Sequence, residues 1–316
     1  MNKQYKYSLA KKGKWICPEC GHKTFVCYVD ENGNVLDESV GKCDRADKCA
    51  HHYPPREYFQ DNNLPMPHMT STVQPSLPTY VKPSYMDPDL FKRSVLGTET
   101  HTNHLVTYLG SKFDAETVKR MKHDYYIGTS KHWAGATVFW QIDQFGHIHA
   151  GKIMQYNPVT GKRVKVPFNH VTWAHTVLQL TDFNMKQCLF GEHLIRKRPN
   201  NGVAIVESEK TAIFLSGYID TFVFVATGGC GNLNAALCEP LRGRCVFLFP
   251  DNGKYEEWRE KGNAMSHLFQ RLIISDIMER EAVNQGDDLA DYLARWQWNP
   301  ATFSPSFIDL GLQQLK

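Results

Sequence analysis

Apolar residues in the second half of the chain come in short, uninterrupted runs. The runs lie at Val203–Val206, Thr221–Val225, Cys245–Phe249 and Leu272–Ser275. Runs of this length are typical of strands that are buried on both faces of a parallel sheet. The segments between and after them have helical spacing, at Glu209–Tyr218, Tyr255–Phe269 and Leu289–Trp296. Strands that alternate with helices predict an α/β fold whose parallel sheet is covered on both faces.

The pattern before residue 187 is different and predicts antiparallel strands. Residues Thr137–Tyr156 read as a hairpin with a turn at Gln144–Gly146. A second turn at Asn157–Gly161 leads to an expected third strand, Lys162–Val166. Three short helices are expected ahead of this sheet: one opened by Asp87 and Pro88 and running to about Ser94, then Thr102–Leu109 and Asp114–Met121. This part is expected to be a small mixed α+β subdomain.

Prolines concentrate between residues 54 and 88. Eight of them lie there: Pro54, Pro55, Pro65, Pro67, Pro75, Pro78, Pro83 and Pro88. Such a stretch predicts an extended, semi-rigid linker. The expected division is therefore a ribbon at 1–60, a linker at 61–88, the mixed subdomain at 89–186, the parallel α/β domain at 187–300 and a tail at 301–316.

Five of the nine cysteines lie near the N-terminus, and their spacing predicts a zinc site. Cys17 and Cys20 form a Cys-x-x-Cys turn, and Cys43 and Cys49 form a second, wider pair. A hairpin with an Asn-Gly turn is expected between the pairs, from Thr24 to Leu36, which is the layout of a zinc ribbon. Four protein ligands leave no open position, so the zinc would be structural.

Two features of this cysteine pattern are less regular. The second pair is separated by five residues, so His51 or His52 is an alternative to Cys49 as the fourth ligand. Cys27 falls inside an expected strand and is assigned to the core. The others, Cys188, Cys230, Cys238 and Cys245, have no metal-binding spacing. An odd number of cysteines also argues against a disulfide framework.

Composition and charge exclude several classes of protein. Hydrophobic residues make up 42% and aromatic residues 12%, enough for real cores, but no run reaches the roughly 18 apolar residues of a membrane span. The segment Met1–Lys14 is basic and polar, unlike a secretory signal, so a cytoplasmic protein is expected. The net charge of +3 permits nucleic-acid binding without arguing for it. A Gly-x4-Gly-Lys-Ser/Thr loop is absent, which excludes a fused P-loop helicase or ATPase.

Cations and glycines mark two candidate binding elements. Clustered cations on the middle strands, interleaved with Trp133, Trp140 and Tyr156, suggest a nucleic-acid path or an ordinary solvated face; they are Lys152, Lys162, Arg163 and Lys165. The loop after the second parallel strand contains three glycines that would let backbone N–H groups approach a phosphate, unless the loop is a plain turn; they are Gly228, Gly229 and Gly231.

Two apolar strands end directly in acids. Glu207 follows the first parallel strand, and Asp251 follows the third. The carboxyl ends of parallel strands meet at one edge of the sheet, where such folds place their sites. A later segment supplies Asp287, Asp288 and Asp291, and at least one of these acids could join the same edge from a loop. Oxygen ligands suit Mg²⁺ or Mn²⁺, although acids at these positions also serve as helix caps.

Three of these segments resemble a known family. The stretch Val206-Glu-Ser-Glu-Lys-Thr-Ala resembles the first motif of the Toprim fold, which bacterial primases, topoisomerases and certain nucleases share. Phe249-Pro-Asp-Asn-Gly resembles the second motif. Gly286-Asp-Asp-Leu-Ala-Asp-Tyr-Leu is similar to a primase stretch that puts Asp288 in the acidic position. The order of zinc ribbon, linker, mixed subdomain and Toprim-like domain also resembles bacterial primases and Toprim proteins of mobile elements.

The resemblance implies primer synthesis on DNA. Glu207 would be a metal ligand or general base, Asp251 and Asp288 would hold Mg²⁺ or Mn²⁺, and Lys210 would contact phosphate or pair with an acid. Single-stranded DNA and nucleoside triphosphates would be the substrates, and a separate replicative helicase a partner, in replication of a mobile element. Gly253 replaces the second acid of the second motif, with Asn252 a weak neutral substitute, so one metal ligand is missing.

Two other functions share the same residues. A Toprim nuclease would use the metal site to hydrolyse a phosphodiester with water. A DNA-binding or regulatory module without strong catalysis would fit the missing acid at Gly253. A topoisomerase is disfavoured, because the chain is too short for strand-passing domains.

Overall fold

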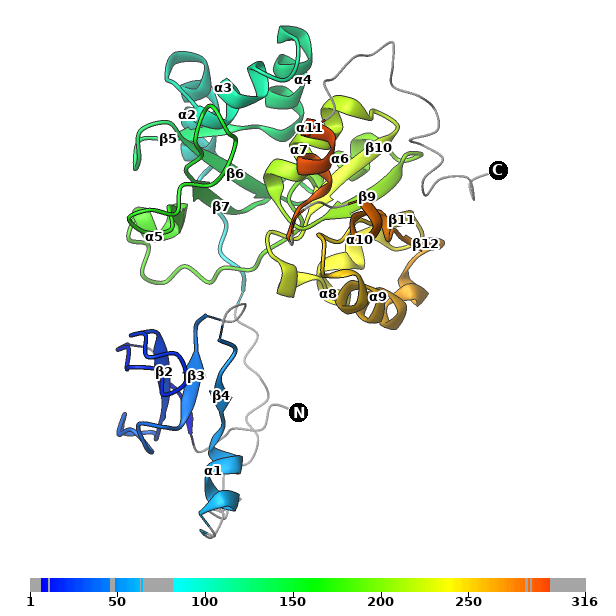
Figure 1. Cartoon of the computed structure of the whole chain (residues 1–316). Coiled ribbons are helices and arrows are strands. Elements are labelled where there is room, and N and C mark those ends of the chain that lie inside the picture. The colour runs from blue at the N-terminus through cyan, green and yellow to red at the C-terminus, as the bar shows by residue number, and fades with distance from the viewer. Residues whose placement is uncertain are drawn as a thin grey trace. The chain divides into compact units, whose positions relative to one another are not determined.

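The structure is a computed structural model that describes residues 7–10, 12–45, 49–62, 64, 82–281, 284 and 286–295 (Figure 1). The chain divides into two compact units, Met1–Tyr80 and Val81–Lys316. Most of the expected linker and all of the expected tail fall outside the described residues. No helix within the described ranges is long and apolar enough to cross a membrane.

The first unit is a four-stranded antiparallel ribbon followed by a short helix. Its elements are β1 (Ser8–Leu9), β2 (Phe25–Val29), β3 (Gly41–Cys43) and β4 (His52–Tyr53), in that sheet order, and α1 (Pro55–Asp61). The expected Asn-Gly turn forms, with Gly33 at φ 85°. The expected strand at Val35 is reduced to a single bridge to Val29, and β2 pairs with β3 instead. Asp37 ends the pairing, because its carboxylate accepts the backbone N–H and the hydroxyl of Ser39 and makes a turn.

The second unit begins with helices around an antiparallel sheet. Its strands, in sheet order, are β5 (Gly128–Ser130), β6 (Ala136–Ile142), β7 (Ile148–Met154) and β8 (Val171–Trp173). The helices are α2 (Pro88–Thr100), α3 (His104–Gly110), α4 (Ala115–Tyr125) and α5 (Ala174–Val177). Asp87 caps α2 by accepting the N–H of Asp89, as its position before Pro88 predicts, but the helix runs six residues past Ser94.

The strand expected at Lys162–Val166 is wrong. Only Arg163 pairs, in a single bridge to Tyr156, and the strand that pairs with β7 on its outer side is β8. Pro167 follows directly and has no N–H to give to a ladder. The chain leaves the sheet after Val164 and returns at His170, whose N–H donates to the carbonyl of Val164 at 3.1 Å.

The remainder of the unit is the predicted parallel α/β sheet. Its strands are β9 (Gly202–Val206), β10 (Phe222–Ala226), β11 (Cys245–Leu248) and β12 (Arg271–Ile274), all parallel, in the order β10-β9-β11-β12. The helices are α6 (His193–Lys197), α7 (Glu209–Tyr218), α8 (Ala235–Cys238), α9 (Tyr255–Ala264), α10 (Ile277–Glu281) and α11 (Leu289–Arg295). This confirms the mixed α/β class with an N-terminal cysteine ribbon.

Both sheets of the second unit contribute to one hydrophobic core. Phe139 of β6 and Met121 of α4 are buried in the same cluster as Phe214 of α7 and Phe224 of β10. The hydroxyl of Tyr125 at the end of α4 also donates to the carbonyl of Phe224 at 3.0 Å. This shared core fixes the antiparallel sheet against the parallel one, and so it fixes the pocket between them.

Candidate functional site

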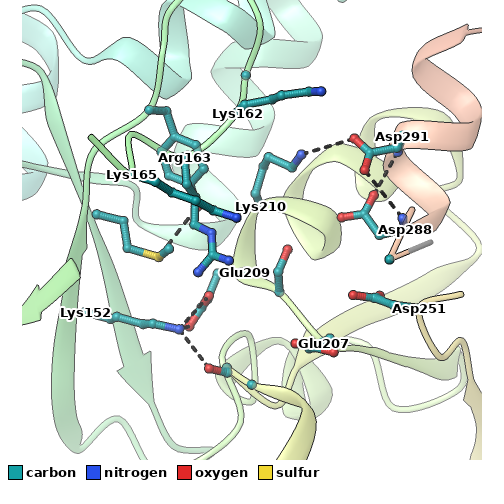
Figure 2. Close-up of a pocket in the computed structure, with 17 residues that line it drawn as sticks. Lys152, Lys162, Arg163, Lys165, Glu207, Glu209, Lys210, Asp251, Asp288 and Asp291 are labelled. Carbon is teal, nitrogen blue, oxygen red and sulfur yellow. Dashed lines mark hydrogen bonds and ion pairs between the residues drawn. The ribbon is translucent and has the colours of Figure 1, made fainter. Parts of the chain in front are cut away.

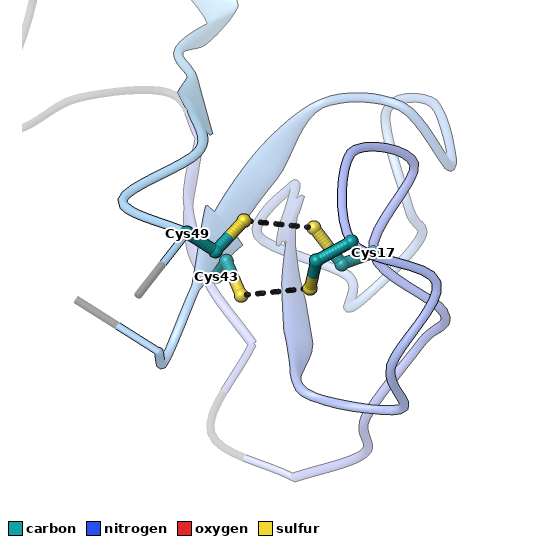
Figure 3. Close-up of side chains that lie close together, drawn as sticks. Cys17, Cys43 and Cys49 are labelled. Atoms are coloured by element: carbon teal, nitrogen blue, oxygen red, sulfur yellow. Dashed lines mark hydrogen bonds between the residues drawn. The ribbon is translucent and has the colours of Figure 1, made fainter. Parts of the chain in front are cut away.

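The four predicted cysteines of the ribbon converge on one point (Figure 3). The sulfur atoms of Cys17, Cys20, Cys43 and Cys49 all lie within 4.8 Å of one another. The Sγ atoms of Cys17 and Cys49 are 3.7 Å apart, and those of Cys20 and Cys43 are 3.9 Å apart. A tetrahedron with Zn–S bonds of about 2.3 Å has S···S edges of about 3.8 Å, whereas a disulfide needs about 2.05 Å. The cluster therefore has the dimensions of a zinc site.

The histidine alternatives to Cys49 have other neighbours. The ring of His51 stacks on Phe25 with centroids 5.7 Å apart. The Nε2 atom of His52 lies 3.0 Å from the hydroxyl of Tyr28. Cys27 is fully buried beside the cluster, as expected for a core residue, and burial raises the pKa of its thiol to about 11. Cys49 is thus the side chain that completes the set of four.

The thiols influence one another's protonation. A backbone hydrogen bond at His22 is the main cause that lowers the pKa of Cys20 to about 6. A backbone hydrogen bond at His51 lowers the pKa of Cys49, but desolvation and the three neighbouring thiols prevail and raise this pKa to about 12. Four thiols in this space cannot all be thiolates without a cation, and Zn²⁺ would supply that cation.

The acidic residues meet at the edge where the parallel strands end. β9 leads to Glu207 and β11 leads to Asp251, and these two strands are neighbours in the sheet. The chain crosses from β9 to β10 on one side and reaches β11 on the other, so the two acids lie at the point where the strand order reverses. Open α/β sheets bind their ligands at this point. The topology therefore brings the two predicted carboxylates together.

A pocket with a volume of about 390 Å³ opens at this edge, between the two sheets (Figure 2). Its charged lining comprises five acids and five cations: Glu207, Glu209, Asp251, Asp288 and Asp291, and Lys152, Lys162, Arg163, Lys165 and Lys210. This volume lies within the roughly 300–1,000 Å³ that is usual for small-molecule sites. The four residues predicted for catalysis and the four cations predicted for nucleic-acid binding all line this one pocket, whereas Trp133 and Trp140 do not.

Two ion pairs account for four of these ten side chains. The Nζ atom of Lys152 lies 3.1 Å from Glu209 Oε1 and also donates to the carbonyl of Gly228 at 2.8 Å. Both side chains are buried, with 12% of Lys152 and 1% of Glu209 exposed. Lys210 Nζ lies 3.7 Å from Asp291 Oδ1. Lys152 is therefore a structural partner of Glu209, and of the two roles considered for Lys210 the pairing with an acid is the one seen.

The remaining charged side chains face one another across the pocket. Figure 2 shows Lys162, Arg163 and Lys165 on one side and the predicted acids on the other. Within the part of the chain that the structure describes, no ion pair joins any of these three cations to an acid. A ligand between the walls would thus meet cationic side chains on one side and Glu207, Asp251 and Asp288 on the other.

Asp288 has a second role as a helix cap. It precedes α11, and its Oδ1 accepts the backbone N–H of Asp291 at 2.8 Å. Its Oδ2 accepts the hydroxyl of Thr211, from α7. Asp288 is therefore a helix cap that also lines the pocket, because the cap fixes the carboxylate at the pocket wall. Metal binding by this acid stays a prediction.

Crowding of the acids changes their protonation. Burial, and next the carboxylates of Glu207 and Asp288, raise the pKa of Asp251 to about 9. Burial and then Asp288 raise the pKa of Asp291. Burial lowers the pKa of Lys210, but the carboxylates of Asp288 and Asp291 prevail, so that the pKa is raised. A divalent cation beside Glu207 and Asp251 would relieve this repulsion, so the donor set fits Mg²⁺ or Mn²⁺.

This acidic set is less compact than the cysteine set. Among the described residues, the donor atoms of the four cysteines all lie within 4.8 Å of one another, and no group of three or more acids or histidines there is as compact. The acids are spread more widely around the pocket. They would hold an ion in an open site, with positions left for substrate oxygens or water.

The glycine loop differs from the expectation. Gly228 and Gly229 line the pocket, but Gly231 does not. The N–H of Gly228 already donates to the carbonyl of Glu207 at 3.0 Å. The first α-helix after the loop, α8, is only four residues long. Gly228 has a φ of 75°, and a Cβ atom on it would lie 3.1 Å from Glu209 Oε1. The absence of a side chain therefore lets the loop pack against the Lys152–Glu209 pair. Phosphate binding by the loop stays a prediction.

The structure also explains the position of the missing acid. Gly253 has φ 82°, and its N–H donates to Glu279 Oε1 at 2.8 Å. The side chain of Asn252 donates to the carbonyl of Asn284 instead of entering the pocket. Neither residue lines the pocket, so neither replaces the absent ligand.

The sequence patterns assign no role to Glu209 and Thr211, whereas Asp291 is one of the three acids expected near this edge. Glu209 and Thr211 lie on either side of Lys210 in the first motif, and Ser208 caps the helix that carries them. A serine at this position predicts a helix start, and so it predicts that Glu209 and Thr211 lie on the first turn of α7. Trp140 and Tyr156 are expected near nucleic acid, and each is only 2% exposed. Trp140 belongs to the core, whereas Tyr156 belongs to the core and also lines the pocket.

Two family matches cover separate parts of the sequence. Residues 5–64 match a zinc beta-ribbon finger family, and residues 103–252 match a domain of unknown function (DUF6371). The first match spans the unit that holds the four cysteines, and together they support a structural zinc ion. No curated protein matches the sequence.

Several solved primase structures are similar to the chain at low identity. The primase fragment of the bacteriophage T7 primase-helicase protein is 13% identical with a TM-score of 0.36, over 91% of this chain and 95% of that one. A DnaG catalytic core is 13% identical with a TM-score of 0.44, over 68% and 76%. The Aquifex aeolicus primase, in its zinc-binding and RNA polymerase domains, is 11% identical with a TM-score of 0.36, over 58% and 47%.

Proposed function

We propose that the chain is a primase-like nucleotidyltransferase that makes primers on single-stranded DNA from nucleoside triphosphates. The observation that supports this is the division of charge in one pocket: Lys162, Arg163 and Lys165 on one wall, and Glu207, Asp251 and Asp288 on the other. A triphosphate and a metal ion need opposite charges on opposite sides. The pocket at the switch point of the sheet provides both.

Each wall has a separate task in this proposal. Lys162, Arg163 and Lys165 form a phosphate-binding wall that the DNA strand and the incoming nucleotide share, and this wall helps to orient the nucleotide for in-line attack. Asp251 and Asp288 would hold Mg²⁺ or Mn²⁺, which when bound would neutralise charge on the phosphates and on the leaving pyrophosphate. Glu207 would be a further ligand or would accept the proton of the attacking 3′-hydroxyl.

The remaining features belong to the same proposal. The acids after β9 and β11 are the Toprim-type part of the site, and the ribbon would contact the template strand. A separate replicative helicase is the proposed partner. Replication of a mobile element is the proposed setting.

The test is a primer-synthesis assay with the zinc-loaded full chain, single-stranded DNA, nucleotides and Mn²⁺. Wild type is expected to extend primers, and Glu207→Gln to lose at least about 100-fold in rate. Glu239→Gln is the matched control, since Glu239 is exposed and paired with Arg242 away from the pocket. No primer from wild type, or equal primer from Glu207→Gln, overturns the proposal.

Two other outcomes of this assay identify the alternatives. DNA degradation that needs Mn²⁺ but no nucleotides, and that Asp251→Asn abolishes, would show a nuclease. DNA binding without added divalent metal and without turnover would show a binding or regulatory module, in keeping with Gly253.

A further inference from the structure

A long stretch around the cationic wall contains no acid. Between Asp143 and Asp182 the 38 residues from 144 to 181 include no Asp or Glu. The same stretch carries the cations of the pocket wall, Lys162, Arg163 and Lys165. The chain is nearly neutral overall, so this segregation makes one surface locally basic.

Part of this stretch projects from the sheet as a loop. Residues 165–169 leave after Val164 and return at His170, and a hydrogen bond between those two residues closes the base of the loop. Two apolar side chains on it are strongly exposed: Val166 is 81% exposed and Phe168 is 54% exposed. Lys165 lies on the same loop and lines the pocket, so the apolar side chains lie beside the cationic wall.

Phe168 belongs to a group of aromatic rings. Its ring stacks on His170 with centroids 4.3 Å apart and 16° between the planes. Trp133 packs edge-on against His170 at 5.0 Å and lies 6.3 Å from Phe168. His132 adds a fourth ring, 4.5 Å from Trp133. We name His132, Trp133, Phe168 and His170 the aromatic patch; His132 and Phe168 are exposed and Trp133 is partly exposed, whereas His170 is buried and supports the ring of Phe168 from below.

We propose that the aromatic patch stacks bases of a single-stranded nucleic acid whose phosphates contact Lys162, Arg163 and Lys165. Proteins that bind single strands combine a basic track with aromatic rings, because every base offers a flat face. A buried duplex base has no free face, and a strand without bases offers only phosphates. The charge of the surface and its exposed rings together therefore fit an unpaired strand.

The proposal deepens the proposed function, because it names where the template would run as it approaches the pocket. Only the identification of the bound strand as a template rests on the proposed function. Binding of a single strand to the patch needs no nucleotide, no divalent metal and no turnover. The two proposals can therefore fail separately.

The experiment is fluorescence anisotropy of labelled oligothymidine with the zinc-loaded full chain, without added divalent metal. Phe168→Ala is expected to weaken binding by about 5- to 100-fold, the usual range for losing one base–aromatic stack. Phe168→Trp should bind like wild type, because it keeps a ring. Leu96→Ala is the control, since Leu96 is 66% exposed on α2 and is not aromatic.

A strand with abasic sites separates stacking from other losses. Wild type should bind it more weakly, and Phe168→Ala should cause no further loss on it. Arg163→Ala should weaken binding to both strands alike. It should also reduce the slope of log K against log salt concentration by about 1, because one phosphate contact is lost. Equal binding of oligothymidine by wild type and Phe168→Ala overturns the proposal, and so does an equal loss on the abasic strand or a preference for duplex. Missing primer synthesis with these results intact overturns only the proposed function.

Discussion

The cysteine cluster and the acidic pocket differ in where their ligands come from along the chain. The cysteines lie on two turns of one small ribbon, between Cys17 and Cys49. The acids come from the ends of β9 and β11 and from the start of α11, between Glu207 and Asp288. A site built from one short segment can be recognised by spacing, whereas a site built from several strands needs the sheet topology.

The two regions also differ in how their charge is balanced. In the pocket, two of the five acids are paired with lysines, Glu209 with Lys152 and Asp291 with Lys210. In the ribbon, the sulfurs face one another inside a small core that includes Phe25 and Cys27. We therefore expect the ribbon to depend on its metal for folding, and the pocket to persist without one.

Removal of zinc is expected to have the largest effect. Cys43→Ser should reduce bound zinc from about one ion per chain and unfold the ribbon, because structural zinc sites contribute on the order of 10 kcal/mol to small domains. Elemental analysis and hydrogen exchange measure both effects. Exchange in residues 82–295 should not change, and Cys245→Ser, half-buried in β11, is the control. A ribbon that stays protected without zinc would contradict the comparison.

Breaking the buried pair in the pocket is expected to have the next largest effect. Lys152→Met leaves Glu209 buried without its partner and should lower the free energy of unfolding by about 3–5 kcal/mol. Adding Glu209→Gln should recover most of this loss, which denaturant unfolding would measure. Lys92→Met is the control, because the exposed pair of Lys92 with Asp89 contributes less than about 1 kcal/mol. Equal losses in the single and double variants would show that the pair is not coupled.

The smallest expected effect is a pH dependence at Asp251. Its pKa is raised from 3.8 to about 9, so the folded state holds a proton that the unfolded state releases. The resulting stability is fully present below about pH 4 and is lost as the pH rises towards 9. Without added Mg²⁺, the thermal stability of wild type should therefore fall more steeply between pH 5 and 9 than that of Asp251→Asn.

Controls for this pH effect use the metal and a remote acid. Added Mg²⁺ should stabilise wild type most at the high end of the range, where Asp251 is ionised. Asp276→Asn, at an exposed pair with Arg280, should keep the wild-type pH dependence. Parallel curves for wild type and Asp251→Asn would show that crowding at the acidic edge is relieved in some other way.

Local patterns predicted the elements of the fold well where a single signal dominated. Apolar runs located all four parallel strands, and Asp87 before Pro88 located the start of α2. The strand expected at Lys162–Val166 failed because alternation there had no partner strand, and Pro167 removes a donor. The expectation for Trp140 failed because an aromatic residue next to cations in sequence can face the opposite side of a strand, whereas Tyr156 lines the pocket as well as the core.

The sequence by itself determined which four cysteines would cluster, where strands and helices alternate, and which acids follow β9 and β11, because each depends on spacing or on a neighbour in the chain. Asp288 was singled out by its resemblance to a primase stretch. Only the tertiary structure decided which charges remain for a ligand. Lys152 and Lys210 pair with Glu209 and Asp291, and this leaves Lys162, Arg163 and Lys165 facing the acidic wall. Such pairings join residues far apart in the chain, and they depend on the distances and the burial that packing of the two sheets creates.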